Sequence, residues 1–452
     1  MWPVNSLPLM TFNDALTYLL GLGHETLAIK LGLEKSELLL TALDDPQNSY
    51  LKVQIAGTNG KGSTAAFVEA ICREAGIRTG LYTSPHLTRI TERIRIDGEE
   101  IEEAQFGQFV ALVRERAMAL IERGEIATPP SFFEHVTATA LCAFAEAKVE
   151  VAILETGLGG RLDSTTAARA ELVSISPVDF DHQEYLGDKL TQIAAEKAAI
   201  IRPGVAAVIA LQEQEVLDVI LQRCSETGVK PTLVQEADWR LEEKRSDGRI
   251  AAAFRVEDAW ISDVVPGLKG RHQLVNAATA VAIAVELRKT GFHIPDDSIK
   301  KGLEKAKHPG RLEWIEGVPA FLLDGAHNPH GARALAAYLR EFISGPVTLV
   351  FGAMRDKDLS SVLNELAPLA SVIVFTPVVN PRSATTEELR LALGPLAAGR
   401  KVIAARSVDE SIDVALQSTP NSGTICVAGS LYLVGEARTR IKTFGEGGKG
   451  KG

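Results

Sequence analysis

The sequence predicts an α/β protein built from two units, and three observations support this fold class. Short apolar stretches alternate with amphipathic helical stretches, which is typical of a mainly parallel sheet covered by helices. A glycine-rich segment at residues 57–63 stands between one such strand and a helix. A proline-glycine pair at residues 309–310 interrupts a helical pattern, and a second series of strands and helices follows it. We therefore expect a P-loop domain followed by a smaller, Rossmann-like α/β domain.

The bulk composition fits a globular protein with more than one core. A chain of 452 residues is too long for one ordinary core, and 46% hydrophobic with 23% charged residues is usual for a soluble protein. No apolar run approaches the ~18 residues that a membrane span needs. The net charge of −10 argues against nucleic acid as the main partner. The cysteines lie far apart, which fits reduced thiols. We expect a cytoplasmic monomer with no nucleic-acid or membrane partner.

The first unit is expected to span residues 1–308. After the helix at residues 296–307 the pattern breaks, which sets this boundary. The stretch from about residue 231 to 265 has mixed charges and short alternating segments, such as residues 250–256, and predicts an antiparallel flank. The expected strands are residues 51–56, 80–82, 151–154, 172–176 and 205–211, with helices from about residue 61 and at residues 132–147.

The second unit is expected to span residues 309–442, ahead of a flexible tail rich in glycine and lysine at residues 443–452. Its strands alternate with helices at short, regular intervals, which predicts a doubly wound domain. The expected strands are residues 320–323, 347–351, 372–375, 401–404 and 424–427.

The clearest chemical signal is the loop GTNGKGS at residues 57–63. A strand, a glycine loop and a helix bind phosphate because backbone N–H groups converge on its oxygens and the helix dipole favours an anion. Lys61 adds positive charge, and Ser63 or Thr64 could reach Mg²⁺. Gly62 separates the lysine from the hydroxyl residue, unlike the common GxxxxGK[ST] spacing. A purely structural glycine turn does not explain the lysine and hydroxyls. The predicted phosphate contacts are Thr58, Asn59, Gly60, Lys61, Gly62 and Ser63.

Two further candidates follow predicted strands. Glu155 ends the strand at residues 151–154, where ligands of open parallel sheets bind, and is a candidate Mg²⁺ ligand. An acidic residue after a strand is by itself more often an ordinary loop residue. Only the presence of the phosphate loop upstream favours a metal ligand here. His182 follows the next strand at the same rim. A lone histidine is usually structural, and Mg²⁺ prefers oxygen ligands.

Lys197 lies in an apolar stripe of the predicted helix at residues 190–201, so its side chain is expected to face inward. A buried ammonium without a partner is costly, and it must therefore be paired, deprotonated or modified. A lysine at the edge of the stripe, with its charge reaching water, is the alternative.

With these residues in view, the chain resembles the folylpolyglutamate synthase and dihydrofolate synthase family, relatives of the Mur ligases. The resemblance covers nearly the whole chain and rests on separated motifs in a fixed order. These motifs are GTNGKGS at 57–63, TSPHL at 83–87 with ERI at 92–94, SFFE at 131–134, ETGLGGRLD at 155–163, DH at 181–182, EKA at 196–198, HQ at 272–273 with NAA at 276–278, PGR at 309–311 and LDGAHNP at 323–329.

The resemblance implies a Mur-ligase-like central domain with defined ligand sites. Two Mg²⁺ ions would be held by Ser84, Glu155 and His182. Lys197 would be carbamylated, which would turn the buried ammonium into an anion. ATP would lie between the domains, in contact with Asn276, Arg311 and Asp324, and the catalytic residues would be Lys61, Lys197 and His327. The pterin pocket would be bordered by Ser131, Phe132, Phe133, Glu134, Leu162, Asp163 and Ser164, although Phe132 and Phe133 fit a core role equally well.

Two positions depart from the family pattern. The usual glycine after Lys-Ala is Ala199 here, and the usual threonine of the DHT motif is Gln183. Neither change removes a residue expected to bind metal or phosphate. The two changes therefore weaken the assignment of the subfamily more than that of the reaction.

The reaction that the resemblance implies is ATP-dependent addition of L-glutamate to dihydropteroate and to reduced folates, through an acyl phosphate, with release of ADP and phosphate. A monofunctional folylpolyglutamate synthase is the first alternative. Another Mur-type ligase is disfavoured because only about fifty residues precede Gly57, too few for the added N-terminal domain of those enzymes. A P-loop ATPase or switch would turn over nucleotide without needing glutamate.

Overall fold

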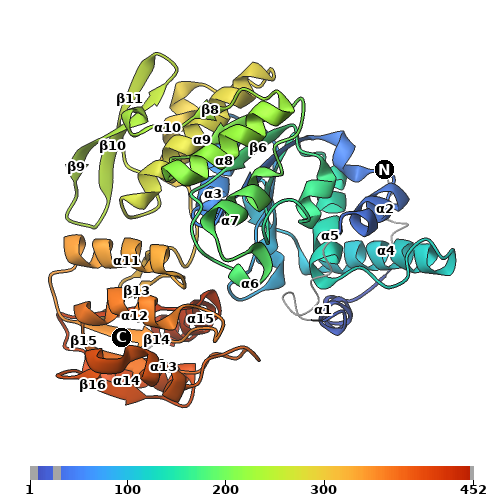
Figure 1. Ribbon diagram of the computed structural model, residues 1–452. Helices are drawn as coiled ribbons and strands as arrows, with labels where there is room; N and C mark the ends of the chain where they lie inside the picture. The colour runs from blue at the N-terminus through green and yellow to red at the C-terminus, as the bar shows by residue number, and fades with distance from the viewer. Residues whose placement is uncertain (1–8, 24–31, 448–452) are drawn as a thin grey trace.

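The structure, a computed structural model, describes residues 9–23 and 32–447. It consists of two α/β units, one above the other in Figure 1. The four cysteines are buried and unpaired, as predicted. None of the helices in the described part of the chain is long and apolar enough to cross a membrane.

The first unit is built on an eight-stranded sheet with the order β4-β3-β2-β5-β1-β6-β7-β8. Strands β2, β5, β1, β6, β7 and β8 run parallel, which confirms the predicted parallel sheet. Strands β3 and β4 form an antiparallel edge that was not expected. The strands are β1 (Leu51–Ala56), β2 (Thr79–Tyr82), β3 (Ile94–Ile96), β4 (Glu99–Glu100), β5 (Val151–Glu155), β6 (Leu172–Ile175), β7 (Ala206–Ile209) and β8 (Thr232–Leu233).

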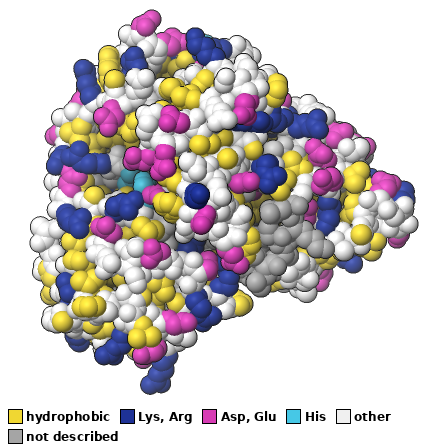
Figure 2. Space-filling view, viewed as in Figure 1, with side chains coloured by type: hydrophobic (Ala, Val, Ile, Leu, Met, Phe, Trp, Pro, Cys, Tyr) yellow, Lys and Arg dark blue, Asp and Glu magenta, His cyan; other side chains and the backbone are white. Residues whose placement is uncertain are grey.

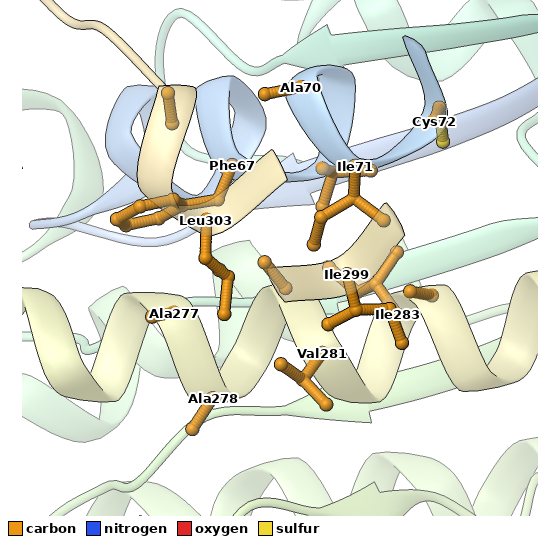
Figure 3. Packing of buried hydrophobic residues seen from close by; sticks show 14 of the residues in the cluster. Phe67, Ala70, Ile71, Cys72, Ala277, Ala278, Val281, Ile283, Ile299 and Leu303 are labelled. Carbon is orange, nitrogen blue, oxygen red and sulfur yellow. The ribbon is translucent and has the colours of Figure 1, made fainter. Parts of the chain in front are cut away.

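Helices cover both faces of this sheet. The hydrophobic cluster on one face joins α3, α9 and α10 to the sheet. Figure 3 shows Phe67 of α3 beside Leu303 of α10, and Ile71 of α3 facing Ile299 of α10. The other face carries α1, α2, α4 and α5 on one half and α7 and α8 on the other. The helices are α1 (Phe12–Gly21), α2 (Glu34–Ala42), α3 (Lys61–Glu74), α4 (Glu103–Glu122), α5 (Phe132–Glu146), α6 (Gln183–Leu186), α7 (Leu190–Ala198), α8 (Gln214–Thr227), α9 (His272–Lys289) and α10 (Asp296–Lys305).

The predicted antiparallel flank is confirmed as a three-stranded sheet with the order β11-β10-β9. It comprises β9 (Trp239–Lys244), β10 (Ile250–Val256) and β11 (Ala259–Val264), and lies beyond α9 and α10 in Figure 1. Six of the seven residues of β10 are buried, so this strand extends the core of the first unit.

The second unit has a six-stranded sheet with the order β12-β13-β17-β14-β15-β16. Only β12 is antiparallel, and the alternation of strands and helices agrees with the predicted doubly wound domain. One face packs against α11, α12 and α13, the other against α14 and α15. The elements are β12 (Glu313–Ile315), β13 (Ala320–Leu323), α11 (Pro329–Phe342), β14 (Val347–Phe351), α12 (Leu359–Leu366), β15 (Ala370–Phe375), α13 (Thr386–Leu393), β16 (Lys401–Ala404), α14 (Val408–Ser418), β17 (Thr424–Ala428) and α15 (Leu431–Gly447).

The end of the second unit differs from the prediction. Helix α15 continues to Gly447, so residues 443–447 of the expected tail are helical. A single glycine such as Gly445 costs a helix only about 1 kcal/mol and does not by itself end one. Residues 448–452 lie outside the described residues. The boundary predicted at residues 308 and 309 falls in the link between α10 and β12 and stays a prediction.

Candidate active site

The glycine loop connects β1 to α3 and leaves the first turn of the helix open. Gly57 and Gly60 have positive φ angles of 149° and 85°, which side chains rarely adopt. A Cβ at Gly57 would lie 1.9 Å from the hydroxyl oxygen of Ser176, and a Cβ at Gly60 would lie 2.2 Å from Oδ1 of Asn276. Gly60 is the N-cap of α3, and no side chain of a described residue caps this end. The amides of the first turn can therefore donate to a phosphate.

Two lysines face the same backbone carbonyl. Lys197 Nζ donates to the Gly57 carbonyl oxygen at 2.7 Å, and Lys61 Nζ lies 3.2 Å from that oxygen. Lys197 is only 4% exposed, which confirms that it faces inward. Burial, and secondarily the charge of Lys61, lowers the pKa of Lys197 to about 7. Burial also lowers the pKa of Lys61. The carboxylates of Glu155 and Asp181 attract Lys61, and those of Asp181 and Asp163 attract Lys197. None of these three acids forms a salt bridge with either amine, so a bound anion would further stabilise the two positive charges.

Glu155 lies at the carboxyl end of β5, beside the glycine loop at the end of β1. Its Oε2 accepts a hydrogen bond from the Ser84 amide at 3.1 Å, and the residue is 6% exposed. Burial raises the pKa of Glu155, and the charge of Lys61 opposes that shift. The carboxylate forms no salt bridge with a residue of the described chain, and so it is left with a free oxygen for a cation.

Ser84, Glu155 and His182 line one cavity together with the phosphate loop. Burial lowers the pKa of His182 to about 3, so the imidazole is neutral near pH 7 and can act as a ligand. Among the described residues, no group of three His, Cys, Asp or Glu side chains could hold a metal by itself. A cation here would need the serine hydroxyl and phosphate oxygens as further ligands.

The second unit forms the opposite wall of this cavity. Asn328 Nδ2 donates to Asn59 Oδ1 at 3.1 Å, directly across the cleft. Asp324 accepts hydrogen bonds from the Leu312 and Ala326 amides at 2.8 and 2.9 Å, so its carboxylate also fixes the surrounding loop. All residues predicted to contact the nucleotide line this one cavity, namely Thr58, Asn59, Gly60, Lys61, Gly62, Ser63, Asn276, Arg311 and Asp324, as do Lys197 and His327.

Asp181 connects the two units, a role that the sequence did not reveal. Its carboxylate binds Lys357 Nζ at 2.5 Å and lies 3.3 Å from His327 Nε2. Although burial opposes it, the hydrogen bond from His327 and the neighbouring positive groups hold the pKa of Asp181 well below its usual range. A second bond joins Arg333 of α11 to Asp179 at 3.0 Å. Lys357 follows β14, and the preference of ligands for the carboxyl ends of parallel strands could have identified it.

A second cavity adjoins the first and is more apolar. Of the predicted pterin-pocket residues, Ser131, Phe133, Glu134, Leu162, Asp163 and Ser164 line it. Phe132 does not line this cavity. Its ring lies in the core of the first unit, 5.3 Å from the guanidinium of Arg93, because it points to the side of α5 that packs on the sheet. Residues of this lining that the sequence did not suggest are Tyr185, Met354, Lys357, Arg382 and Tyr432.

Two acidic side chains that line this second cavity also accept hydrogen bonds from backbone amides. Glu134 Oε2 accepts from the Ser131 amide at 2.7 Å in a capping box that begins α5. Asp163 accepts hydrogen bonds from the amides of Gly157, Leu158 and Thr165 at 2.9 to 3.0 Å, and from the Thr165 hydroxyl at 2.6 Å. Asp163 therefore shapes the loop after β5 as well as bordering the cavity.

The two cavities meet at Ser84, Gly157, His182 and His327, which line both. Near the junction of the two units, histidine side chains are visible among acidic and basic ones (Figure 2). A phosphate loop facing a second domain, with an apolar pocket beside it, defines the class of two-domain ligases that activate an acceptor with a nucleotide. Residues 55–284 match the Mur ligase middle domain, and residues 310–431 match the Mur ligase glutamate ligase domain.

Relatives place the chain within this class. It is 33% identical to the dihydrofolate synthase/folylpolyglutamate synthase of Bacillus subtilis, over 93% of this chain and 97% of the relative. It is 37% identical to a probable bifunctional folylpolyglutamate synthase/dihydropteroate synthase of Haloferax volcanii, over 95% of this chain but 50% of that relative. The chain thus spans about half the length of the haloarchaeal relatives it matches. The chain belongs to the folylpolyglutamate synthase/dihydrofolate synthase family of Mur ligases.

Solved structures agree with this assignment. Mycobacterium tuberculosis folylpolyglutamate synthase complexed with ADP superposes with a TM-score of 0.86 and 32% identity, covering 94% of this chain and 98% of that one. Escherichia coli FolC in complex with DHPP and ADP has a TM-score of 0.83 and 30% identity, covering 98% and 100%. A bifunctional folylpolyglutamate synthase/dihydrofolate synthase with Mn, AMPPNP and L-glutamate bound has a TM-score of 0.82 and 31% identity, covering 97% and 100%.

Proposed function

We propose that the chain is an ATP-dependent carbon–nitrogen ligase that adds L-glutamate to dihydropteroate and to tetrahydrofolate carrying one or more glutamates. The observation that carries this proposal is that the phosphate-loop cavity and the more apolar cavity meet at Ser84, His182 and His327. A γ-phosphate in the first and a carboxylate in the second would come together there. The relatives support this reading, since their solved complexes contain ADP, DHPP, AMPPNP, Mn and L-glutamate.

The reaction would begin with attack of the acceptor carboxylate on the γ-phosphate, which forms an acyl phosphate and ADP. The amino group of glutamate then attacks the acyl carbon, the bond to phosphate breaks, and the amine loses a proton. Lys61 and the open N-terminus of α3 would stabilise the charge on the transferred phosphoryl group. The bond between Asn328 and Asn59 would keep the cleft closed, which protects an acyl phosphate from water.

The metal that this chemistry requires fits the residues present. Glu155 is a buried carboxylate whose hydrogen-bond partner among the described residues is the Ser84 amide, so a cation would complete its environment. Ser84, Glu155 and His182 would hold Mg²⁺, and two ions are expected. Bound Mg²⁺ would neutralise charge on the phosphate oxygens.

We further propose that Lys197 is carbamylated. The neutral amine adds to CO₂, forms an N–C bond and releases one proton, so a lowered pKa favours the reaction. Burial and a pKa of about 7 give Lys197 a substantial neutral fraction near neutral pH. The carbamate would then supply the anion beside Lys61. A Lys197→Ala variant should lose activity and regain part of it with added acetate or propionate. Under ¹³CO₂ the parent should show a ¹³C carbamate signal that is absent from this variant. Rescue failure together with no signal in the parent would exclude the carbamate.

ADP release, measured with each acceptor separately, tests the activity. We expect turnover that requires both L-glutamate and either dihydropteroate or tetrahydrofolate. ADP release that requires L-glutamate and occurs with tetrahydrofolate but not with dihydropteroate would identify a monofunctional folylpolyglutamate synthase. Turnover without glutamate would instead identify an ATPase or switch and would refute the ligase proposal.

A further inference from the structure

A third cavity lies on the other side of the loop that carries Ser84. It shares Ser84, Glu155 and Arg311 with the phosphate-loop cavity. From there it extends past the link between the two units, and Lys307 on its wall is exposed to solvent. The cavity therefore borders the expected position of the γ-phosphate and also reaches the solvent-exposed Lys307.

The walls of this third cavity carry unbalanced positive charge. The side chains of Arg95, Lys307 and Arg311 form no hydrogen bond or salt bridge with any residue in the described part of the chain. Arg95 and Arg311 are nevertheless partly buried. Arg311 is attracted to the carboxylates of Asp324 and Glu155, and Arg95 to that of Glu69, but none of these three acids forms a salt bridge with either guanidinium. A partly buried guanidinium without such a close partner loses hydration with only partial compensation.

The two acids on the same walls do not balance these cations. The carboxylate of Glu92 already accepts hydrogen bonds from the loop that follows Ser84. It accepts from the Leu87 amide at 2.7 Å, from the Thr88 and Arg89 amides at 3.1 Å and from the Thr88 hydroxyl at 2.5 Å. Glu155 faces the phosphate loop and is the expected metal ligand. Positive charge therefore dominates between Arg95, Lys307 and Arg311.

A single glycine separates this cavity from the phosphate loop. A Cβ on Gly62 would lie 2.7 Å from Nε2 of His308 and 3.2 Å from Oε2 of Glu155. The imidazole of His308 thus packs directly on the first turn of α3. Burial, followed by the charges of Arg311 and Arg95, lowers the pKa of His308 to about 3. The ring is neutral near pH 7 and can donate one hydrogen bond into the cavity.

We propose that this cavity binds a small oxyanion, held by Arg95, Lys307 and Arg311. A guanidinium is a planar donor that matches the oxygens of phosphate and carboxylate. Two small molecules of the proposed reaction have this chemistry, and the inference rests on that reaction. They are the inorganic phosphate that is released and the carboxylates of the incoming glutamate. The cavity adjoins the site where the first forms and the second is consumed.

Arg95 is the residue that distinguishes this cavity from the nucleotide site, because it lines only the third cavity. The test compares the parent with Arg95→Met and Lys307→Met by phosphate inhibition at saturating ATP and by KM for L-glutamate. A charge-assisted hydrogen bond is worth about 1.5–3 kcal/mol, so its loss should weaken the affected constant by about tenfold or more. Arg95→Lys keeps the positive charge but not the planar guanidinium, so it should restore only part of the loss. Arg116→Met, at a partly buried site on α4 that lines none of the three cavities, controls for net charge.

The outcome distinguishes the two ligands. Weaker phosphate inhibition with unchanged KM for glutamate identifies phosphate, and a raised KM for glutamate identifies the amino acid carboxylate. If neither constant changes while the parent turns over, or if Arg116→Met has the same effects, the oxyanion site is refuted. Should the parent show no ligase turnover, ³¹P line broadening of inorganic phosphate on the ADP-bound protein still tests the cavity. Equal broadening with the parent and Arg95→Met would refute it, whereas reduced broadening with Arg95→Met would support it.

Discussion

Replacing Gly62 by alanine tests why a glycine separates Lys61 from Ser63. The residue is helical and does not have positive φ, so alanine introduces no backbone strain there. The added Cβ would lie 2.7 Å from Nε2 of His308 and 3.2 Å from Oε2 of Glu155, both closer than the 3.5–4.0 Å at which carbon atoms attract best. The substitution therefore presses on two groups of the site at once.

The net effect on stability follows from two opposing terms. Alanine gains up to about 1 kcal/mol over glycine in a helix. Overpacking costs about 1–3 kcal/mol, and the His308 ring can relieve part of it by rotation. We expect Gly62→Ala to lower the free energy of unfolding by about 0–2 kcal/mol. The substitution should also affect catalysis, because a displacement of Glu155 by a few tenths of an ångström should lower kcat by roughly tenfold.

A double-mutant cycle with His308→Ala separates the two contacts. Urea unfolding should show a coupling energy of about 1–2 kcal/mol, because removing the imidazole makes room for the new methyl group. ADP release should not recover in the double variant, since the contact with Glu155 remains. Additive losses of stability, or a Gly62→Ala protein as active as the parent, would show that the glycine is not required by these neighbours.

Three further predictions concern the residues around the site. Phe132→Ala should cost about 3–5 kcal/mol in urea unfolding because the ring is in the core, whereas Phe133→Ala should raise KM for the pterin acceptor with little loss of stability. Burial lowers the pKa of His135 from 6.5 to about 3, so the free energy of unfolding should fall by up to about 1.4 kcal/mol per pH unit as the pH drops below 6.5. Urea unfolding of His135→Phe at pH 7 and pH 5 should lack this part of the pH dependence. Asp181→Asn should destabilise the protein by about 3–5 kcal/mol because Lys357 is left buried and unpaired, and a lower melting temperature that Lys357→Met restores in part would confirm this.

The long parallel strands were predictable because each is a continuous apolar run bounded by turn residues. The short edge strands were not, since two or three residues cannot show an alternating pattern. One local signal was nevertheless present at β3 and β4. Asp97 and Gly98 both have positive φ, at 52° and 86°, as a two-residue hairpin turn requires, and Asp-Gly is a favoured pair for it.

The candidate site was predictable where its residues follow strands. The phosphate-loop residues 58–63 and Glu155 come together because the carboxyl ends of the parallel strands β1 and β5 meet at one edge of the sheet. The pair of Asp181 and Lys357 was not predictable, because its members are 176 residues apart and belong to different units. For two adjacent helical residues such as Phe132 and Phe133, the pattern indicates that one faces the core but does not say which.

The distribution of charge explains how a chain with a net charge of −10 can be specific for anionic ligands. Five cations that form no salt bridge with a described residue line the phosphate-loop cavity or the cavity beside it, namely Lys61, Lys197, Arg311, Arg95 and Lys307. Long nucleic acids would meet the acidic exterior, whereas a small anion that enters the cleft meets concentrated positive charge. Each proposed substrate or product is an anion, so the same local potential that binds them would draw the two units together, and closure would depend on the cleft being filled.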